Sequence, residues 1–164
     1  MSACAPSAPN SSLTAEYVNP IITATRSVFE MMLGCVPTRT GLRLKEPGEH
    51  SHDVSAVIGI SGRAQGTIVV SLTRESACAV VERMIGEKET EINAVVCDAV
   101  GELTNMIAGS AKAQLAKYEL SISLPNVIAG HNYVMHSPSD VQSMIMSFNS
   151  EIGPFWIEIA FTGF

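Results

Sequence analysis

Two runs rich in β-branched residues face each other across a short turn in this sequence. Residues 53–60 and 64–72 are both typical of strands, and Ser61-Gly62 between them is typical of a tight turn. We therefore predict a β-hairpin at this point. Helices are expected before and after it, followed by further strands, so helices and strands do not alternate one by one. This order predicts an α+β fold with a largely antiparallel sheet, covered on one face by about three helices.

The boundaries of the helices are marked by capping residues. Asn19 and Pro20 are typical of a cap and a first turn, which predicts that the first helix begins there and runs to Leu33. Thr73 is expected to cap the second helix, and the third and longest covers about residues 92–117. The other strands are expected over 38–45, 120–129 with a break at Pro125, 132–136, 141–149 and 154–162.

The chain is poor in charge. Only 16% of its 164 residues are charged and 46% are apolar, which excludes disorder over most of its length, because disordered chains combine low hydrophobicity with high charge. The net charge of −6 argues against a nucleic-acid partner, since binding to a phosphate backbone needs a basic face. A chain of this length is expected to form one domain, which we assign to residues 14–164 after a flexible tail of residues 1–13.

The sequence does not predict a membrane or an oxidising compartment. No stretch approaches the ~18 apolar residues that a membrane span needs, and residues 2–12 lack the apolar run of a signal peptide. No two of the four cysteines have CxxC spacing, and Cys35, Cys78 and Cys97 have apolar neighbours. We therefore expect buried, reduced thiols and a cytoplasmic location.

The third helix carries its polar residues on one side. With Asp98 at zero on a wheel of ~100° per residue, Glu102 lies at about 40° and Asn105 at about −20°. Gly109 and Lys112 fall on the same stripe, at about 20° and about −40°. The opposite side is expected to face the core and comprises Ile92, Val96, Ala99, Val100, Leu103, Met106, Ile107 and Ala113. The stripe is therefore expected to point outward.

A solvated helix face would account for such a stripe, but two details favour a binding surface. Asn is a poor residue for a helix interior, because its side chain competes for backbone hydrogen bonds. The stripe is also flanked by small residues, among them Gly101 and Gly109, and each interior glycine costs roughly 0.5–1 kcal/mol relative to alanine. A surface that another molecule must approach closely gains from small residues, whereas a bare surface does not.

An outward amide beside a carboxylate suits chemistry on a phosphoryl group held by another protein. A neutral amide both donates and accepts hydrogen bonds, so Asn105 could hold a water in line with a phosphorus atom. Glu102 would repel a phosphoryl group unless it pairs with a cation already at the site. The sequence contains no P-loop and no GxSxG elbow of its own. These residues therefore favour a partner that brings its own lysine and metal.

Residues 101–109 resemble the active-helix motif of the CheC/CheX/FliY chemotaxis phosphatases. In that family an Asp or Ser is followed by Glu four residues later, by Asn three residues after that, and then by Pro; these places hold Asp98, Glu102, Asn105 and Pro125 here. The spacing to Pro125 is shorter than in the CheC type, so we expect a strand-end role for it. Other segments resemble the CheX type in the same order: 18–22 with Val28-Phe29, 57–62 with Gly66-Thr67, and 124–130.

The resemblance implies a two-component signalling enzyme, a hydrolase that dephosphorylates the phosphoaspartate of a CheY-like receiver domain. Asn105 would orient the attacking water, and Glu102 would pair with a receiver lysine. The chain itself would need no cofactor, because Mg²⁺ would belong to the receiver. The residues expected to contact the partner are Asp98, Gly101, Gly109 and Lys112.

The resemblance also implies a homodimer joined through its sheet. Strands such as 67–72 or 141–148 could supply the unpaired edge that this needs. CheC-type members carry two active helices and CheX-type members carry one. Glu16 and Asn19 repeat the Glu-x-x-Asn spacing, but an N-cap at Asn19 would leave Glu16 outside the helix, so one site per chain is expected.

Two other functions fit parts of the sequence. A non-catalytic adaptor, related to the flagellar switch proteins by fold alone, would bind a phosphorylated receiver without changing the lifetime of its phosphoryl group. A metal or redox site would use Cys35, His50 and His52, although no complete ligand set is evident around them.

Overall fold

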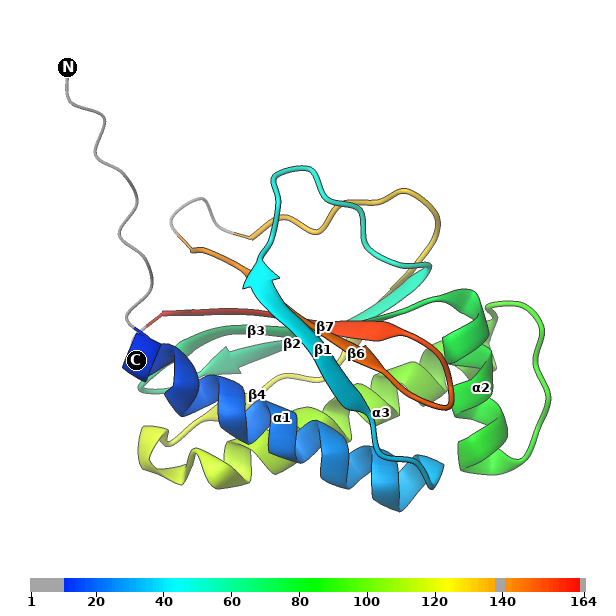
Figure 1. The fold of residues 1–164 in the computed structure, drawn as a ribbon, viewed down its shortest axis with the longest axis horizontal. Coiled ribbons are helices and arrows are strands. Elements are labelled where there is room, and N and C mark those ends of the chain that lie inside the picture. The colour runs from blue at the N-terminus through cyan, green and yellow to red at the C-terminus, as the bar shows by residue number, and fades with distance from the viewer. Residues whose placement is uncertain (1–10, 138–140, 163–164) are drawn as a thin grey trace.

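The computed structural model describes residues 11–137 and 141–162, which form a layer of helices on a seven-stranded sheet (Figure 1). The helices are α1 (Ser11–Leu33), α2 (Arg74–Ile85), α3 (Ala94–Gln114) and the short 3₁₀ helix η1 (Ala116–Tyr118). The strands are β1 (Thr38–Leu44), β2 (Val54–Ser61), β3 (Gln65–Leu72), β4 (Ser121–Ile122), β5 (Asn126–Ala129), β6 (Met144–Asn149) and β7 (Phe155–Thr162).

The strands are paired antiparallel in the order β1-β6-β7-β3-β2-β4, and β5 also pairs with β2. The three α-helices lie together on one side of this sheet (Figure 1). The predicted α+β fold is therefore confirmed. The predicted hairpin is β2–β3, whose register runs from Val54 opposite Leu72 to Ile60 opposite Gly66. Gly62 in its turn has φ +135°, a conformation that side-chain-bearing residues rarely adopt.

The prediction for the start of the first helix is wrong. α1 begins at Ser11, and Pro20 lies inside it rather than in its first turn. Proline removes one helical hydrogen bond and crowds the preceding turn. The helix continues through it because Val18 and Ile21 on either side are buried in the core, and this packing outweighs the local preference. The predicted tail, residues 1–13, lies outside the described residues except for its last three, which belong to α1.

The other elements follow the sequence closely, with one exception. Thr73 caps α2 by accepting a hydrogen bond from the Ser76 amide, and Gly86 ends that helix with φ +76°. The expected strand over 132–136 does not form, and only an isolated bridge joins Val134 to His50. This segment contributes to a loop over the sheet. One backbone hydrogen bond, from the Ser51 amide to the Tyr133 carbonyl, and several side-chain hydrogen bonds hold it there.

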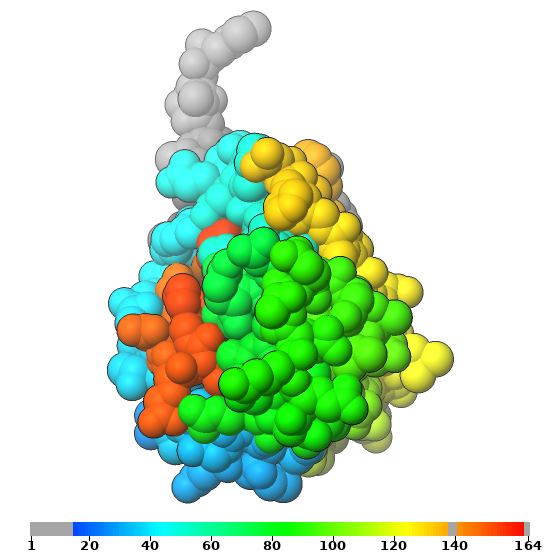
Figure 2. All heavy atoms as spheres, turned by 90° about the vertical axis from the view of Figure 1, so that its right-hand side faces the viewer, coloured from blue at the N-terminus to red at the C-terminus, as the bar shows by residue number. Residues whose placement is uncertain are grey.

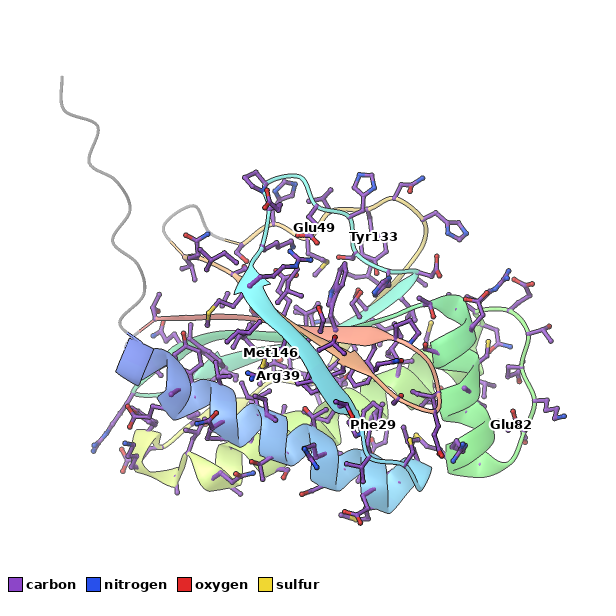
Figure 3. All side chains as sticks on the ribbon, in the orientation of Figure 1. Phe29, Arg39, Glu49, Glu82, Tyr133 and Met146 are labelled. Atoms are coloured by element: carbon purple, nitrogen blue, oxygen red, sulfur yellow. The ribbon has the colours of Figure 1, made fainter. Side chains whose placement is uncertain are left out.

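The apolar core lies between the helices and the sheet. Phe29 of α1 stacks on Phe155 of β7 at a centroid distance of 4.6 Å, and Phe148 of β6 stacks on the same ring at 5.0 Å. Figure 3 shows Phe29 and Met146 in this layer, between α1 and the strands. Each of these side chains is almost fully buried, so the three rings fix α1 against the centre of the sheet.

Two loops, residues 45–53 and 130–137, lie over the opposite side of the sheet; we call this side the loop-covered face. Glu49 and Tyr133 extend from these loops on the side away from the helices (Figure 3). Lys45 donates hydrogen bonds to both carboxylate oxygens of Glu158 at 3.0 and 2.9 Å, and to the Met135 carbonyl at 2.6 Å. This ion pair is buried, with side-chain exposures of 9% and 3%.

Further polar side chains of the loop-covered face also have partners. The Tyr133 hydroxyl donates to Ser55 Oγ at 2.7 Å, and Ser55 Oγ donates to Ser71 Oγ at 2.9 Å. The His52 ring lies 4.1 Å from the Trp156 ring, and burial lowers the pKa of His52 while the charge of Asp53 opposes that shift. Polar groups on this face therefore hold the loops to the sheet.

Candidate functional site

α3 is positioned by a cap at one end and by an apolar stripe along its length. Asn93 caps it by accepting a hydrogen bond from the Val96 amide at 3.0 Å. This cap defines the first residue of the helix, which the apolar pattern alone does not. Val96, Val100, Leu103 and Ile107 recur at three- and four-residue steps and are buried in the core. The opposite side of the helix is thereby turned outward.

The predicted polar stripe lies on this outward side. The side chains of Asp98, Glu102 and Lys112 are exposed, and Asn105 and Gly109 are half-buried. Among the residues that the structure describes, none forms a side-chain hydrogen bond or ion pair with Asp98, Glu102, Asn105 or Lys112. The structure thus brings all four together on one face of α3, with their polar groups free to meet another molecule.

The apolar side of α3 differs from the prediction at its C-terminal end. Ala113 is exposed rather than buried, whereas Ala99 and Met106 are half-buried and pack against the core as predicted. Ala113 lies in an open groove with Leu120 and Ile122, because the chain turns back after η1 and leaves a gap beside the last turns of α3. Ala113 therefore belongs to the surface and not to the core.

Gly101 does not lie on the outward surface, which corrects its predicted role as a partner contact. It is buried, and a Cβ atom added to it would lie 3.3 Å from Val127 Cγ2 and 3.6 Å from Pro125 Cγ. The small residue lets β5 approach α3 within the chain itself. Gly109 differs, because nothing lies within 4 Å of where its Cβ would be. Only Gly109 keeps open space above the helix.

Pro125 immediately precedes β5, which confirms its expected position at a strand end. Its ring lies over Gly101, one turn from both Asp98 and Asn105, so it borders the polar stripe. The sequence gives no local signal for this contact, since it joins residues that are distant in the chain. The resemblance to the family motif, which includes Pro125, was the indication that the sequence offered.

The thiol next to the stripe, Cys97, has a raised pKa. Burial raises the pKa of Cys97, and the negative charge of Asp98 raises it further. Cys97 is half-buried rather than buried, whereas Cys35 and Cys78 are buried as expected, and all three are free thiols. A thiol with a raised pKa stays protonated near neutral pH and is a poor nucleophile. The polar chemistry of this surface therefore rests on the carboxylates and the amide.

The second Glu-x-x-Asn pair does lie on a helix, which overturns the reason for discounting it. Glu16 and Asn19 are both within α1, three residues apart. However, Glu16 forms an ion pair with Lys117, and Pro20 next to Asn19 accepts a hydrogen bond from Gln114 at 3.4 Å. This part of α1 is therefore joined to the C-terminal end of α3, and Glu16 is already paired. The α3 stripe is the site whose carboxylate is free.

Two features of the described part of the chain bear on other functions. No group of three or more His, Cys, Asp and Glu residues in it is arranged to hold a metal ion. No helix within it combines the length and apolar character required to span a membrane.

Comparison with known proteins identifies relatives along most of the chain. Residues 54–149, which include the whole polar stripe, match the model of the family described as chemotaxis phosphatase CheX. A similar curated protein is the CheY-P phosphatase CheX of Thermotoga maritima, which is 28% identical over 142 residues. That similarity covers 85% of this chain and 92% of the relative.

Solved structures give the same family. The chemotaxis protein CheX from Desulfovibrio desulfuricans is 34% identical, with a TM-score of 0.81 over 90% of this chain and 99% of that one. The CheX of a CheX-CheY-BeF₃-Mg²⁺ complex from Borrelia burgdorferi has the same fold, with a TM-score of 0.74 at 22% identity. It covers 88% of this chain and 97% of that one. The present chain is therefore an enzyme rather than an adaptor, and it belongs to the CheX family of chemotaxis phosphatases.

Proposed function

We propose that this phosphatase removes the phosphoryl group from the phosphoaspartate of a CheY-like receiver domain, using Asn105 and Glu102. Asn105 would orient the attacking water in line with the phosphorus atom, and Glu102 would pair with a receiver lysine beside the phosphoaspartate. Positioning is most of what a catalyst contributes to phosphoryl transfer, so a fixed neutral amide suits the task.

One observation carries this proposal. The Glu102 and Asn105 side chains lie on the outward face of α3, whose opposite face is buried, and they have no partner in the described part of the chain. Because Asn105 is half-buried, its amide is restrained, whereas exposed Glu102 can reach outward to a lysine. A receiver that occupies this face would bring the phosphoryl group to the amide and its own lysine to the carboxylate.

Mg²⁺ would be supplied by the receiver and not by this chain. Asp98 and Glu102 project from a helix surface without a third carboxylate to complete a hard-cation site among the described residues. The Borrelia relative was crystallised with CheY, BeF₃ and Mg²⁺ together. A receiver-bound cation would also offset the repulsion between the phosphoryl group and the acidic stripe.

The test is the rate of phosphate release from a phosphorylated CheY-like receiver, with and without the protein. We expect the wild-type chain to accelerate release and Asn105→Ala to abolish that acceleration without changing thermal stability. Asn105→Asp tests the neutral charge of the amide and is expected to be equally inactive, since it adds a negative charge beside the phosphoryl group. Full activity of Asn105→Ala would refute the proposal.

We also propose that the chain forms a homodimer through a free edge of its sheet. The strands expected to supply this edge, 67–72 and 141–148, are wrong candidates, because β3 and β6 each have a strand on both sides. β1 is an edge strand, and its Leu42 and Leu44 side chains are 41% and 42% exposed. Light scattering of the protein and of Leu42→Asp would measure the mass, and a monomeric wild type would refute this proposal.

The cytoplasmic location remains a proposal as well. It is supported by three free thiols, two of them buried, in a chain that resembles cytoplasmic signalling enzymes.

A further inference from the structure

Residues 120–127 run alongside α3 in the opposite direction. Leu120 and Ile122 line a groove together with Gly109 near the C-terminal end of the helix. Pro125 lies over Gly101, two turns closer to the helix N-terminus. Leu124 therefore falls between these contacts. Asn105 is midway between Gly101 and Gly109 on the helix, and Leu124 is next to Pro125, whose ring borders the polar stripe at Gly101.

Leu124 is held outward by a fixed backbone. Its side chain is 84% exposed, the largest value among the exposed large apolar residues that the structure describes. The preceding residue, Ser123, donates its amide to the Gly59 carbonyl and accepts the Gly59 amide on its hydroxyl, both at 2.9 Å. An exposed leucine is ordinary on any protein surface. This one is notable because strand β2 and the packed ring of Pro125 hold it beside the site.

An apolar groove continues the same surface beyond Leu124. Its volume is about 500 Å³, and its walls are Ala113, Ala116, Leu120 and Ile122, with Gly109, Lys112 and Glu119 also lining it. Gly109 and Lys112 are members of the polar stripe, so groove and stripe form one continuous surface. No atom within 4 Å occupies the space above Gly109, so a side chain from another molecule could enter there. In Figure 2 the yellow part of the chain lies beside the green helices.

The charge of the stripe shows why apolar contacts are needed at this place. Asp98 and Glu102 are exposed carboxylates, and a phosphorylated aspartate brings further negative charge to the same surface. These negative charges oppose the complex, and the receiver lysine and the receiver-bound cation are needed to offset them. Apolar burial is independent of charge, so it can supply affinity without altering the field at the phosphoryl group.

We propose that Leu124 and the groove at Gly109 form the apolar docking surface for the same phosphorylated receiver. Leu124 packs on the receiver beside the stripe, and an apolar receiver side chain enters the groove at Gly109. This proposal rests on the proposed function, because continuity with the Glu102–Asn105 stripe is what identifies the receiver as the occupant. The two contacts fix the orientation of the phosphoryl group relative to the amide.

The experiment measures phosphate release as a function of receiver concentration, with wild-type protein and with Leu124→Asn. We expect the variant to raise KM about tenfold and to leave kcat within about twofold, because the anchor contributes to binding and not to the chemistry. Titration with a CheY-like receiver carrying beryllium fluoride and Mg²⁺ should show the same loss of affinity. Met31→Asn is the matched control: Met31 is 71% exposed on α1, and its variant should keep the wild-type KM.

Gly109→Leu tests the surface from the groove side. It fills open space and removes an interior glycine, so the helix should remain folded, while KM is expected to rise as for Leu124→Asn. Unchanged KM in both variants overturns the proposal. A shift in the dimer mass, with unchanged receiver affinity, would also overturn it and assign the surface to a second copy. If the wild-type protein accelerates no receiver, the proposed function itself has failed, which is a distinguishable result.

Discussion

The outward stripe of α3 and the loop-covered face of the sheet both carry polar side chains. They differ in whether these side chains have partners within the chain. On the loop-covered face, Lys45 and Glu158 are buried and satisfy each other. On the stripe, Glu102 and Asn105 have no partner among the described residues. Buried polar groups without partners destabilise a fold, whereas exposed ones are solvated until something replaces the water. The stripe is thus available for function, and the other face is committed to structure.

The comparison predicts its largest effect for Lys45→Met. Glu158 would then be left buried without its cation. We therefore expect the free energy of unfolding to decrease by about 3–5 kcal/mol. Urea unfolding measures the change. Replacing both residues, as Lys45→Met with Glu158→Leu, should recover much of the loss, because no uncompensated charge remains. A single variant as stable as the wild type would show that the pair is not structural.

On the stripe, Glu102→Gln is expected to lower kcat/KM for receiver dephosphorylation by about 10- to 100-fold while leaving stability within about 0.5 kcal/mol. The reason is the loss of the proposed pair with a receiver lysine at an exposed position. A double-mutant cycle with a receiver whose lysine is changed to methionine tests the pair directly. Strictly additive losses would mean that Glu102 acts in some other way.

Replacing each of the two glycines of α3 by alanine should have a smaller effect on stability, and the effect should differ between them. Gly109→Ala should stabilise the protein by about 0.5–1 kcal/mol, because the added methyl group meets open space. Gly101→Ala should gain less or lose stability, since its methyl group would lie 3.3 Å from Val127 Cγ2. Thermal unfolding of both variants makes the comparison. An equal gain in both would contradict the packing of β5 on Gly101.

The smallest expected effect is a pH dependence from the loop-covered face. Burial lowers the pKa of His52 in the folded protein, and Asp53 opposes part of this shift. Below about pH 6.5 the unfolded chain therefore binds more protons at His52 than the folded one, and stability falls as the pH decreases. His52→Asn should flatten this dependence. Urea midpoints at about pH 7.5 and about pH 5.5 measure it, with the fluorescence of the single tryptophan as probe.

Much of the fold could be predicted because local signals and tertiary structure agree in most elements. The hairpin, the Thr73 cap and the Gly86 stop are all read from adjacent residues. The start of α1 could not be predicted in this way, because burial of Val18 and Ile21 overrides the effect of Pro20. The strand predicted over 132–136 does not form for a similar reason. The residues that this segment contacts lie in a loop far away in the sequence.

The site was predictable where it follows helical geometry and not where it depends on distant packing. The spacing of Asp98, Glu102 and Asn105 is enough to place them on one face of a helix. The burial of Gly101 under Pro125, and the exposure of Leu124 beside it, depend on how residues 120–127 return along α3. No periodicity within the helix carries that information, so the sequence assigned Gly101 to the surface and did not single out Leu124.

The position of β7 has a consequence for how the chain is made. This strand lies in the middle of the sheet, between β3 and β6, and β1 has β6 as its single partner among the described strands. During synthesis β1 and one edge of β3 therefore lack their partners until β6 and β7 have been made, whereas β2 can already pair with β3. Sheets that depend on pairings between distant segments fold slowly and expose unpaired edges in the meantime. Helix α3 packs mainly on β2 and β5, which precede β7 in the chain, so its side of the sheet can pair before the central strand is made.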